Sequence, residues 1–134
     1  SGRTGSNKLR PVMNVPTGGV ISSLSDSSAV FCDGVDHHVL VAFDWATGEV
    51  KLFRDGSLSD AYPANSYSRT GSATPVGTFG LLGTAAGTNG YAGKAYGTQL
   101  YYKPGVGLPS NLSLIAAKLA ASPATFLSDA DLAW

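Results

Sequence analysis

Aromatic and polar side chains of the types that bind sugars occur in segments of this sequence that lack strand or helix periodicity. Sugars are bound by aromatic rings that stack on the C–H groups of a pyranose, while nearby amide, carboxylate and guanidinium groups hold the hydroxyls. The residues of these types are Trp45, Tyr62, Asn65, Tyr67, Arg69, Asn89 and Tyr91. Packing of the aromatic residues against the protein itself explains the set equally well, so the sequence leaves both interpretations open.

Catalytic groups are scarce by comparison. Glycoside hydrolysis requires two carboxylates that flank the scissile bond. The chain has a single glutamate, Glu49, in a predicted hairpin turn, and eight scattered aspartates. Cys32 is the only cysteine, and no histidine stands at a spacing typical of a nucleophile pair, which favours a cysteine in the core. We therefore expect a protein that is not an enzyme.

The two histidines, His37 and His38, are adjacent at the start of a segment whose pattern predicts a strand. Neighbouring strand residues point to opposite faces of a sheet, so the pair does not converge on one metal ion. The sequence favours one packed and one exposed histidine, and predicts no metal site from them.

The composition limits the class of protein. The 134 residues, 43% of them hydrophobic, suffice for one domain with a core, which we place at residues 9–134 after a small, polar and flexible arm at residues 1–8. Charged residues make up 13% and the net charge is zero, which argues against nucleic acid or an anionic membrane surface as the partner. A single cysteine excludes an internal disulfide, and no apolar run approaches the roughly 18 residues of a membrane-spanning helix.

The clearest structural pattern is a hairpin. Residues 39–44 are mostly apolar on both faces and predict a strand that is covered on both sides. A turn at residues 45–48 and a second antiparallel strand at residues 50–54 follow. Asp55-Gly56 is the strongest short turn signal in the chain. We expect a long loop at residues 62–74, because this segment is polar and contains proline and glycine.

Weaker patterns predict further elements. Short apolar runs favour strands at residues 20–21, 29–32, 77–82 and 95–103. One helix is predicted from an i, i+3, i+4, i+7 pattern of apolar residues, with Ser110 as its N-cap and Pro123 beyond its end. The residues of that pattern are Leu112, Ile115, Ala116 and Leu119.

The last segment contains Ser128 and Asp131 at the spacing of a capping box, which indicates one helical turn or a docked tail. Together these elements predict a mainly β fold, an antiparallel β-sandwich of the jelly-roll type with one short C-terminal helix.

The predicted hairpin also resembles a known family. Residues 36–44 open with the His-His pair, and residues 48–56 run from a Gly-Glu turn to a strand that ends in an aromatic residue, one further residue and Asp-Gly. This order is similar to that of the laminin G-like and concanavalin A-like lectin family. Residues 93–102 resemble its late strand, which begins with glycine and ends with an aliphatic-Tyr pair, and residues 108–119 resemble the helix that follows.

The resemblance implies a concanavalin A-like sandwich and a non-catalytic module that binds carbohydrate. The Glu-x-Asp-x-x-Glu strand of the hydrolase branch is missing from the sequence. Relatives often hold calcium through carboxylate, amide and backbone oxygens near loop ends, so calcium is the metal to test, although turn-forming residues need no metal. The oxygen donors here are Asp33, Asp36, Asp44, Asp55 and Asn89. We expect no other cofactor.

Family members occur on cell-surface proteins, phage tail fibres and other virion proteins. We therefore expect an extracellular or virion-surface location and a homo-oligomer. The alternative is a structural virion protein, a decoration or fibre-tip domain that acts through subunit contacts and is most simply a trimer. Its contacts would then come from the apolar residues near the two ends, at 9–12 and 126–134.

Overall fold

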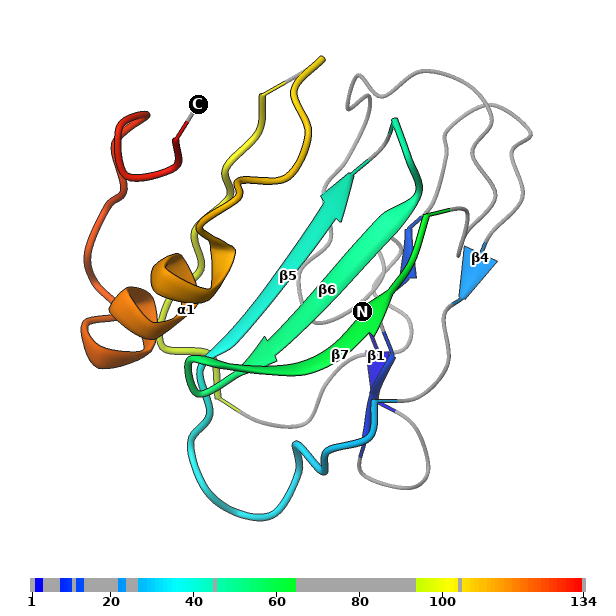
Figure 1. The fold of residues 1–134 in the computed structure, drawn as a ribbon. Coiled ribbons are helices and arrows are strands. Elements are labelled where there is room, and N and C mark those ends of the chain that lie inside the picture. The colour runs from blue at the N-terminus through cyan, green and yellow to red at the C-terminus, as the bar shows by residue number, and fades with distance from the viewer. Residues whose placement is uncertain are drawn as a thin grey trace, which may run out of the picture.

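The structure is a computed structural model, which describes residues 2–3, 8–10, 12–13, 22–23, 27–44, 46–64, 94–103 and 105–133. This part of the chain consists mainly of strands, with a three-stranded antiparallel sheet and one helix (Figure 1). The short strands form two antiparallel pairs and are β1 (Gly2–Arg3), β2 (Leu9–Arg10), β3 (Val12–Met13) and β4 (Ser22–Ser23). The longer elements are β5 (Val39–Asp44), β6 (Glu49–Arg54), β7 (Ser57–Tyr62) and α1 (Leu112–Ala121).

The predicted hairpin is confirmed as β5 and β6. Their register runs from Val39 opposite Arg54 to Asp44 opposite Glu49. Strand β5 is less covered than we predicted, because Val39 is exposed and the next four residues are half-buried. Leu40 packs with Phe53 on the face towards α1, whereas Val41 packs against the fully buried Val50 on the opposite face.

Strand β7 was not expected, because we predicted only a turn after Arg54 and a loop from Tyr62 onwards. The segment Ser57–Tyr62 lacks β-branched residues, and its Leu58 is 52% exposed. It forms an edge strand because β6 supplies backbone partners from Val50 to Arg54, with an irregularity between Leu52 and Phe53. The hydrogen bonds of a ladder do not depend on side-chain type.

The turn between β6 and β7 has the geometry that the Asp-Gly pair predicts. Asp55 has a φ of 51° and Gly56 a φ of 83°, and positive φ at both central residues is the requirement of a type I′ turn. Gly56 also lies against the helix, since a Cβ atom there would stand 3.1 Å from Cα of Ala117 and 3.2 Å from Cβ of Ala120. The turn therefore packs directly on α1.

Helix α1 covers one face of the sheet (Figure 1). Its buried residues are the predicted set, Leu112, Ile115, Ala116 and Leu119. The helix ends at Ala121, before Pro123, as expected. The predicted N-cap at Ser110 is wrong, because Asn111 holds that position without capping through its side chain. In the described part of the chain, no helix is long and apolar enough to cross a membrane.

The C-terminal segment is a docked turn. The carboxylate of Asp131 accepts the backbone N–H of Ser128 at 2.9 Å, and the Ser128 hydroxyl accepts the N–H of Asp131 at 3.2 Å, which is the reciprocal pattern of a capping box. Leu132 is 5% exposed and packs against Ile115 and Leu119. The segment therefore combines the two predicted features, since it forms one turn, closed by a bond from the Leu132 N–H to the Ser128 carbonyl, and docks on α1.

Two predicted strands are wrong. Residues 29–32 contribute only an isolated bridge, between Val30 and Lys8. Residues 95–103 belong to none of the strands in the described part of the chain, although burial alternates as in a strand from Gln99 to Lys103. Leu127 donates its N–H to the Tyr101 hydroxyl at 2.9 Å, so this segment contacts the C-terminal tail. The predicted strands at residues 20–21 and 77–82 lie outside the described residues.

Candidate functional site

One of the predicted sugar-binding residues lies in the described part of the chain. Tyr62 ends β7 and packs, half-buried, against Val50. The remaining candidates lie outside the described residues and are Trp45, Asn65, Tyr67, Arg69, Asn89 and Tyr91. Their role in binding stays a prediction.

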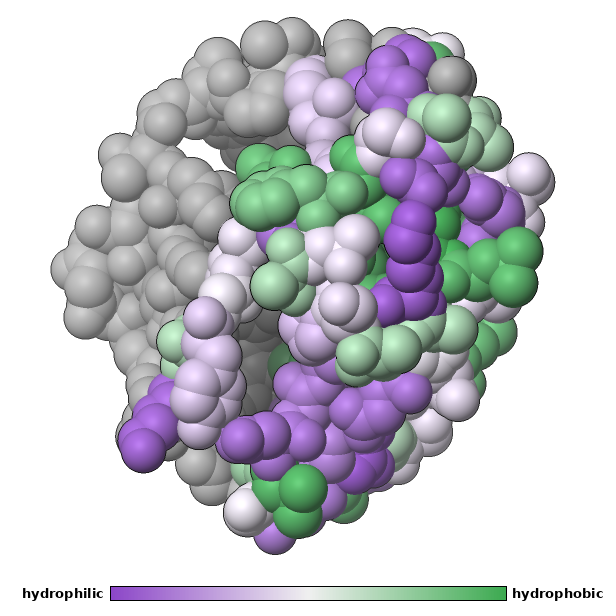
Figure 2. Space-filling view, turned by 90° about the vertical axis from the view of Figure 1, so that its left-hand side faces the viewer, coloured by the Kyte–Doolittle hydropathy of each residue, from purple (hydrophilic) through white to green (hydrophobic). Residues whose placement is uncertain are grey.

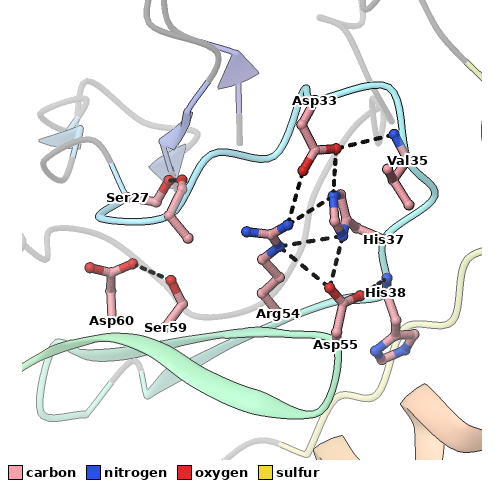
Figure 3. Close-up of polar contacts among 10 residues, drawn as sticks. Ser27, Asp33, Val35, His37, His38, Arg54, Asp55, Ser59 and Asp60 are labelled. Carbon is pink, nitrogen blue, oxygen red and sulfur yellow. Dashed lines mark hydrogen bonds and ion pairs between the residues drawn. The ribbon is translucent and has the colours of Figure 1, made fainter.

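Four charged or titratable side chains gather beside the turn of β6 and β7, and we call Asp33, His37, Arg54 and Asp55 the Asp-His-Arg cluster (Figure 3). The imidazole of His37 lies between two carboxylates, with Nδ1 2.8 Å from Oδ2 of Asp55 and Nε2 2.9 Å from Oδ1 of Asp33. The guanidinium of Arg54 bridges the same carboxylates, with Nη2 3.1 Å from Asp33 and Nε 3.4 Å from Asp55.

Local backbone structure positions both carboxylates. Asp33 accepts the N–H of Val35 at 3.1 Å across a bend in which Gly34 has a φ of 88°. Asp55 accepts the N–H of His38 at 2.9 Å through its side chain and donates its own N–H to the His38 carbonyl at 2.9 Å. The cluster therefore joins residues 33–38 to the end of β6.

Phe31 completes one side of the cluster. Its ring is 7% exposed and meets the His37 ring edge-on, with 6.3 Å between centroids. The guanidinium carbon of Arg54 lies 5.7 Å from the centroid of the same ring, within the range of a cation–π contact. The His37 side chain is 8% exposed, whereas those of Asp33 and Asp55 are 34% and 48% exposed, so water reaches the carboxylates more readily than the imidazole.

The pKa values in the cluster follow from these contacts. Burial lowers the pKa of His37, but the hydrogen bonds to Asp33 and Asp55 outweigh it, so the pKa lies above the ordinary 6.5. The hydrogen bond from His37 holds the pKa of Asp33 below 3.8. For Asp55, burial raises the pKa, but the hydrogen bonds from His37 and from the His38 N–H prevail and bring it below 3.8.

These directions define a pH window for the stability that the cluster contributes. A raised pKa means that folding favours the proton, so the contribution of His37 is complete below 6.5 and is lost as the pH rises through the folded value. Lowered carboxylate pKa values act in the opposite sense, so their contribution is present above 3.8 and is lost as the pH falls through the folded values. The cluster is therefore most stabilising between these limits.

A shallow hollow of about 380 Å³ adjoins the cluster at Arg54. It lies where residues 28–29 run beside β7, an edge strand of the sheet in the described part of the chain. Its lining residues are Ser28, Ala29, Arg54, Ser57, Leu58 and Ser59. Hydrogen bonds hold this wall in place, because Ser28 donates its N–H to the Asp60 carboxylate at 3.1 Å and its hydroxyl to the Ser59 carbonyl at 3.2 Å.

The calcium donors expected from the resemblance are used in other ways or lie apart. Asp33 and Asp55 are held in the Asp-His-Arg cluster. The Asp44 carboxylate accepts the N–H of Ala46 at 2.8 Å and thereby caps the turn between β5 and β6. Asp36 is exposed, and Asn89 lies outside the described residues. Across the residues that the structure describes, no three or more His, Cys, Asp or Glu side chains form a group suited to a metal ion.

The other candidates for chemistry are separate from one another. Glu49 begins β6 and forms an ion pair with Lys51 at 3.3 Å. Cys32 is a half-buried free thiol. His38 is half-buried, and burial lowers the pKa of its imidazole below 6.5. Of the predicted packed and exposed histidines, the packed one is His37, with its side chain 8% exposed, whereas His38 is half-buried rather than exposed.

Sequence reasoning missed the Asp-His-Arg cluster, although the predicted hairpin contained a signal for it. Pairing Val39 with Arg54 brings His38 opposite Asp55 and sets His37 beside the turn. Asp33 lies four residues before His37, but no helix or strand connects them, so spacing alone did not indicate their contact.

The cluster is suited to fixing residues 33–38 on the sheet and to holding Arg54 at the rim of the hollow. Its charged groups satisfy one another, as in a structural ion-pair network. Comparison with known proteins finds no matching family model, no matching curated protein and no matching solved structure.

Proposed function

We propose that this chain is a non-catalytic recognition module that binds carbohydrate, built as a concanavalin A-like β-sandwich. The three-stranded antiparallel sheet and the late helix are compatible with one half of such a sandwich. We further propose that a second sheet completes the sandwich.

The observation that carries the proposal is the position of the family's motifs relative to the strands. The His-His pair directly precedes β5, Gly48 directly precedes β6, and Asp55-Gly56 directly follows β6. These motifs stand at the ends of strands because turns and strand entries need particular residue types there. Helix α1 then begins at Leu112, within the segment that resembles the family's helix.

The mode of binding follows from the residue types. Tyr67 and Tyr91 supply rings for stacking, and neighbouring polar side chains hold the hydroxyls. A shallow site of this kind binds with a dissociation constant of roughly micromolar to millimolar, so several copies are needed for firm attachment. The proposal therefore includes a homo-oligomer that is displayed outside the cell or on a virion.

A glycan array probed with the full chain, with and without added calcium, tests this function. We expect binding that falls roughly tenfold in Tyr67→Ala and Tyr91→Ala. Tyr96→Ala is the matched control, because Tyr96 is 75% exposed and belongs to a different segment. An array without binding under both conditions, for a chain that is folded by circular dichroism, would refute the proposal.

A second candidate is a structural virion protein that acts through subunit contacts. It is favoured by Phe126, which is 82% exposed, and by Leu114 on α1, which is 72% exposed. On the side of the molecule with α1 and the C-terminal segment, hydrophobic and hydrophilic residues are interspersed across the surface (Figure 2). Light scattering decides this candidate, since a stable trimer that Phe126→Ser dissociates supports it and a monomer refutes it.

A further inference from the structure

The hollow beside Arg54 presents hydrogen-bonding groups that the protein itself does not use. The guanidinium directs Nε and Nη2 at the carboxylates of the cluster. Its third nitrogen, Nη1, points away from His37, towards the side of Ser59 and Asp60 (Figure 3). Because the ion pairs fix the other edge of the guanidinium, Nη1 is held in one orientation at the rim of the hollow.

The hydroxyls of the hollow add acceptors next to this donor. Ser59 donates its hydroxyl proton to Asp60 at 2.7 Å, and Ser28 donates its own to the Ser59 carbonyl at 3.2 Å. A hydroxyl that already donates keeps its lone pairs for an incoming donor. Ser57, which is exposed, is free to turn its hydroxyl either way. The hollow therefore offers both donors and acceptors, which is what the hydroxyls of a sugar require.

An apolar surface lies among these polar groups. Leu58 lines the hollow and is 52% exposed, so its side chain is available to the C–H groups of a ring. The volume of about 380 Å³ is at the lower end of the range for small-molecule sites, roughly 300–1,000 Å³. A hollow of this size has room for a small part of an oligosaccharide.

The charge around the hollow selects the class of ligand. The carboxylates of Asp33 and Asp55 contact Arg54, and His37 adds at most one positive charge. A third carboxylate, that of Asp60, is bonded to Ser28 and Ser59 in the wall of the hollow. The carboxylates therefore outnumber the cations whether His37 is protonated or not. An acidic sugar in the hollow would be repelled by this excess of negative charge, because the Asp60 carboxylate is bonded to two of the lining residues.

We propose that the hollow formed by Ser28, Ala29, Arg54, Ser57, Leu58 and Ser59 is a binding site for a neutral, hydroxyl-rich sugar. Nη1 of Arg54 donates to a ring hydroxyl, the serine hydroxyls accept, and Leu58 contacts the C–H face. This inference rests on the proposed function, and it adds a second sugar-binding site, beside β7, to the one proposed at Tyr67 and Tyr91.

The first test compares neutral glycans with sialylated and uronic-acid glycans on the array, and then titrates the best neutral ligand into variants. We expect Leu58→Ala and Ser57→Ala each to weaken binding roughly fivefold, and Arg54→Lys roughly tenfold, because a lysine does not present the fixed planar donor. Leu100→Ala is the matched control for Leu58→Ala, since Leu100 is 71% exposed on a different segment. Its affinity should be unchanged.

The outcomes separate this inference from the proposed function. Normal binding in Leu58→Ala and Ser57→Ala, together with a loss in Tyr67→Ala or Tyr91→Ala, overturns the hollow and leaves carbohydrate binding standing. A preference for acidic glycans also overturns the proposed site at the hollow, but not the proposed carbohydrate binding. A folded chain that binds no glycan overturns both. Because Arg54 stabilises the cluster, Arg54→Lys counts only where its circular dichroism spectrum matches the wild type, and the Leu58 and Ser57 variants carry the test otherwise.

Discussion

Gly56 combines a left-handed backbone with close contact to α1, so Gly56→Ala should destabilise the protein strongly. Two costs add there. An alanine at a φ of 83° has a left-handed backbone, which costs about 1–2 kcal/mol. Its Cβ would also stand 3.1 Å from Cα of Ala117 and 3.2 Å from Cβ of Ala120, and crowding of this kind costs about 1–3 kcal/mol.

The net effect is smaller than these costs, because alanine also restricts the unfolded chain and so recovers about 0.4–1 kcal/mol. We expect Gly56→Ala to lower the free energy of unfolding by about 2–4 kcal/mol. Urea unfolding followed by far-UV circular dichroism measures this loss, and an unchanged slope in urea ensures that the change lies in stability.

Two other glycines separate the backbone cost from the crowding. Gly34 has a φ of 88° with nothing within 4 Å of the added Cβ, so Gly34→Ala should cost about 1 kcal/mol, from the backbone alone. Gly97 has neither a left-handed φ nor a close neighbour, and Gly97→Ala should lie within about 0.5 kcal/mol of the wild type. Equal losses in Gly56→Ala and Gly34→Ala would show that α1 does not pack on the turn, and would refute the reasoning.

Three further outcomes follow from the ion pairs and the docked tail. His37→Gln should abolish the fall in stability that the wild type shows above pH 6.5, where the raised pKa of His37 is crossed, as urea unfolding across pH 5 to 9 would reveal. Lys118 hydrogen-bonds Asp131 and holds its pKa at about 2, so Asp131→Asn should be less stable at neutral pH and lose less stability on acidification below 3.8, as measured by thermal unfolding. Leu132→Ala should cost about 2–5 kcal/mol in urea unfolding, since Leu132 is 5% exposed, whereas Phe126→Ala in the same tail should cost less than about 0.5 kcal/mol.

The elements that could be predicted from the sequence are those whose local chemistry agrees with their packing. Strand β5 is mostly apolar on both faces, and the Asp55-Gly56 pair, which favours positive φ at two successive residues, marks the end of β6. Strands β5 and β6 therefore follow from a short stretch of sequence. Helix α1 was predictable in the same way, because its four apolar positions form one stripe and all four are buried.

The Asp-His-Arg cluster could not be predicted in this way, because it depends on contacts between segments that are distant in the sequence. The bend that brings Asp33 to His37 is irregular backbone, and it is held by the contacts that it helps to form. The edge of β7 has the same origin: Ser59 and Asp60 meet Ser28 only because residues 27–30 run beside this strand. Composition and periodicity carry no information on such neighbours.

Residues 94–103 show why a correct pattern of faces does not guarantee a strand. The alternation that we expected is present, since Gln99 and Tyr101 are half-buried while Leu100 between them is 71% exposed. A strand also needs a second backbone at ladder distance, and the C-terminal tail supplies different bonds. Gln99 donates its side-chain amide to the Pro123 carbonyl at 3.1 Å, and the Tyr101 hydroxyl accepts the N–H of Leu127. Periodicity therefore predicts which side chains turn inwards, whereas the nearest polar groups decide how the backbone is bonded.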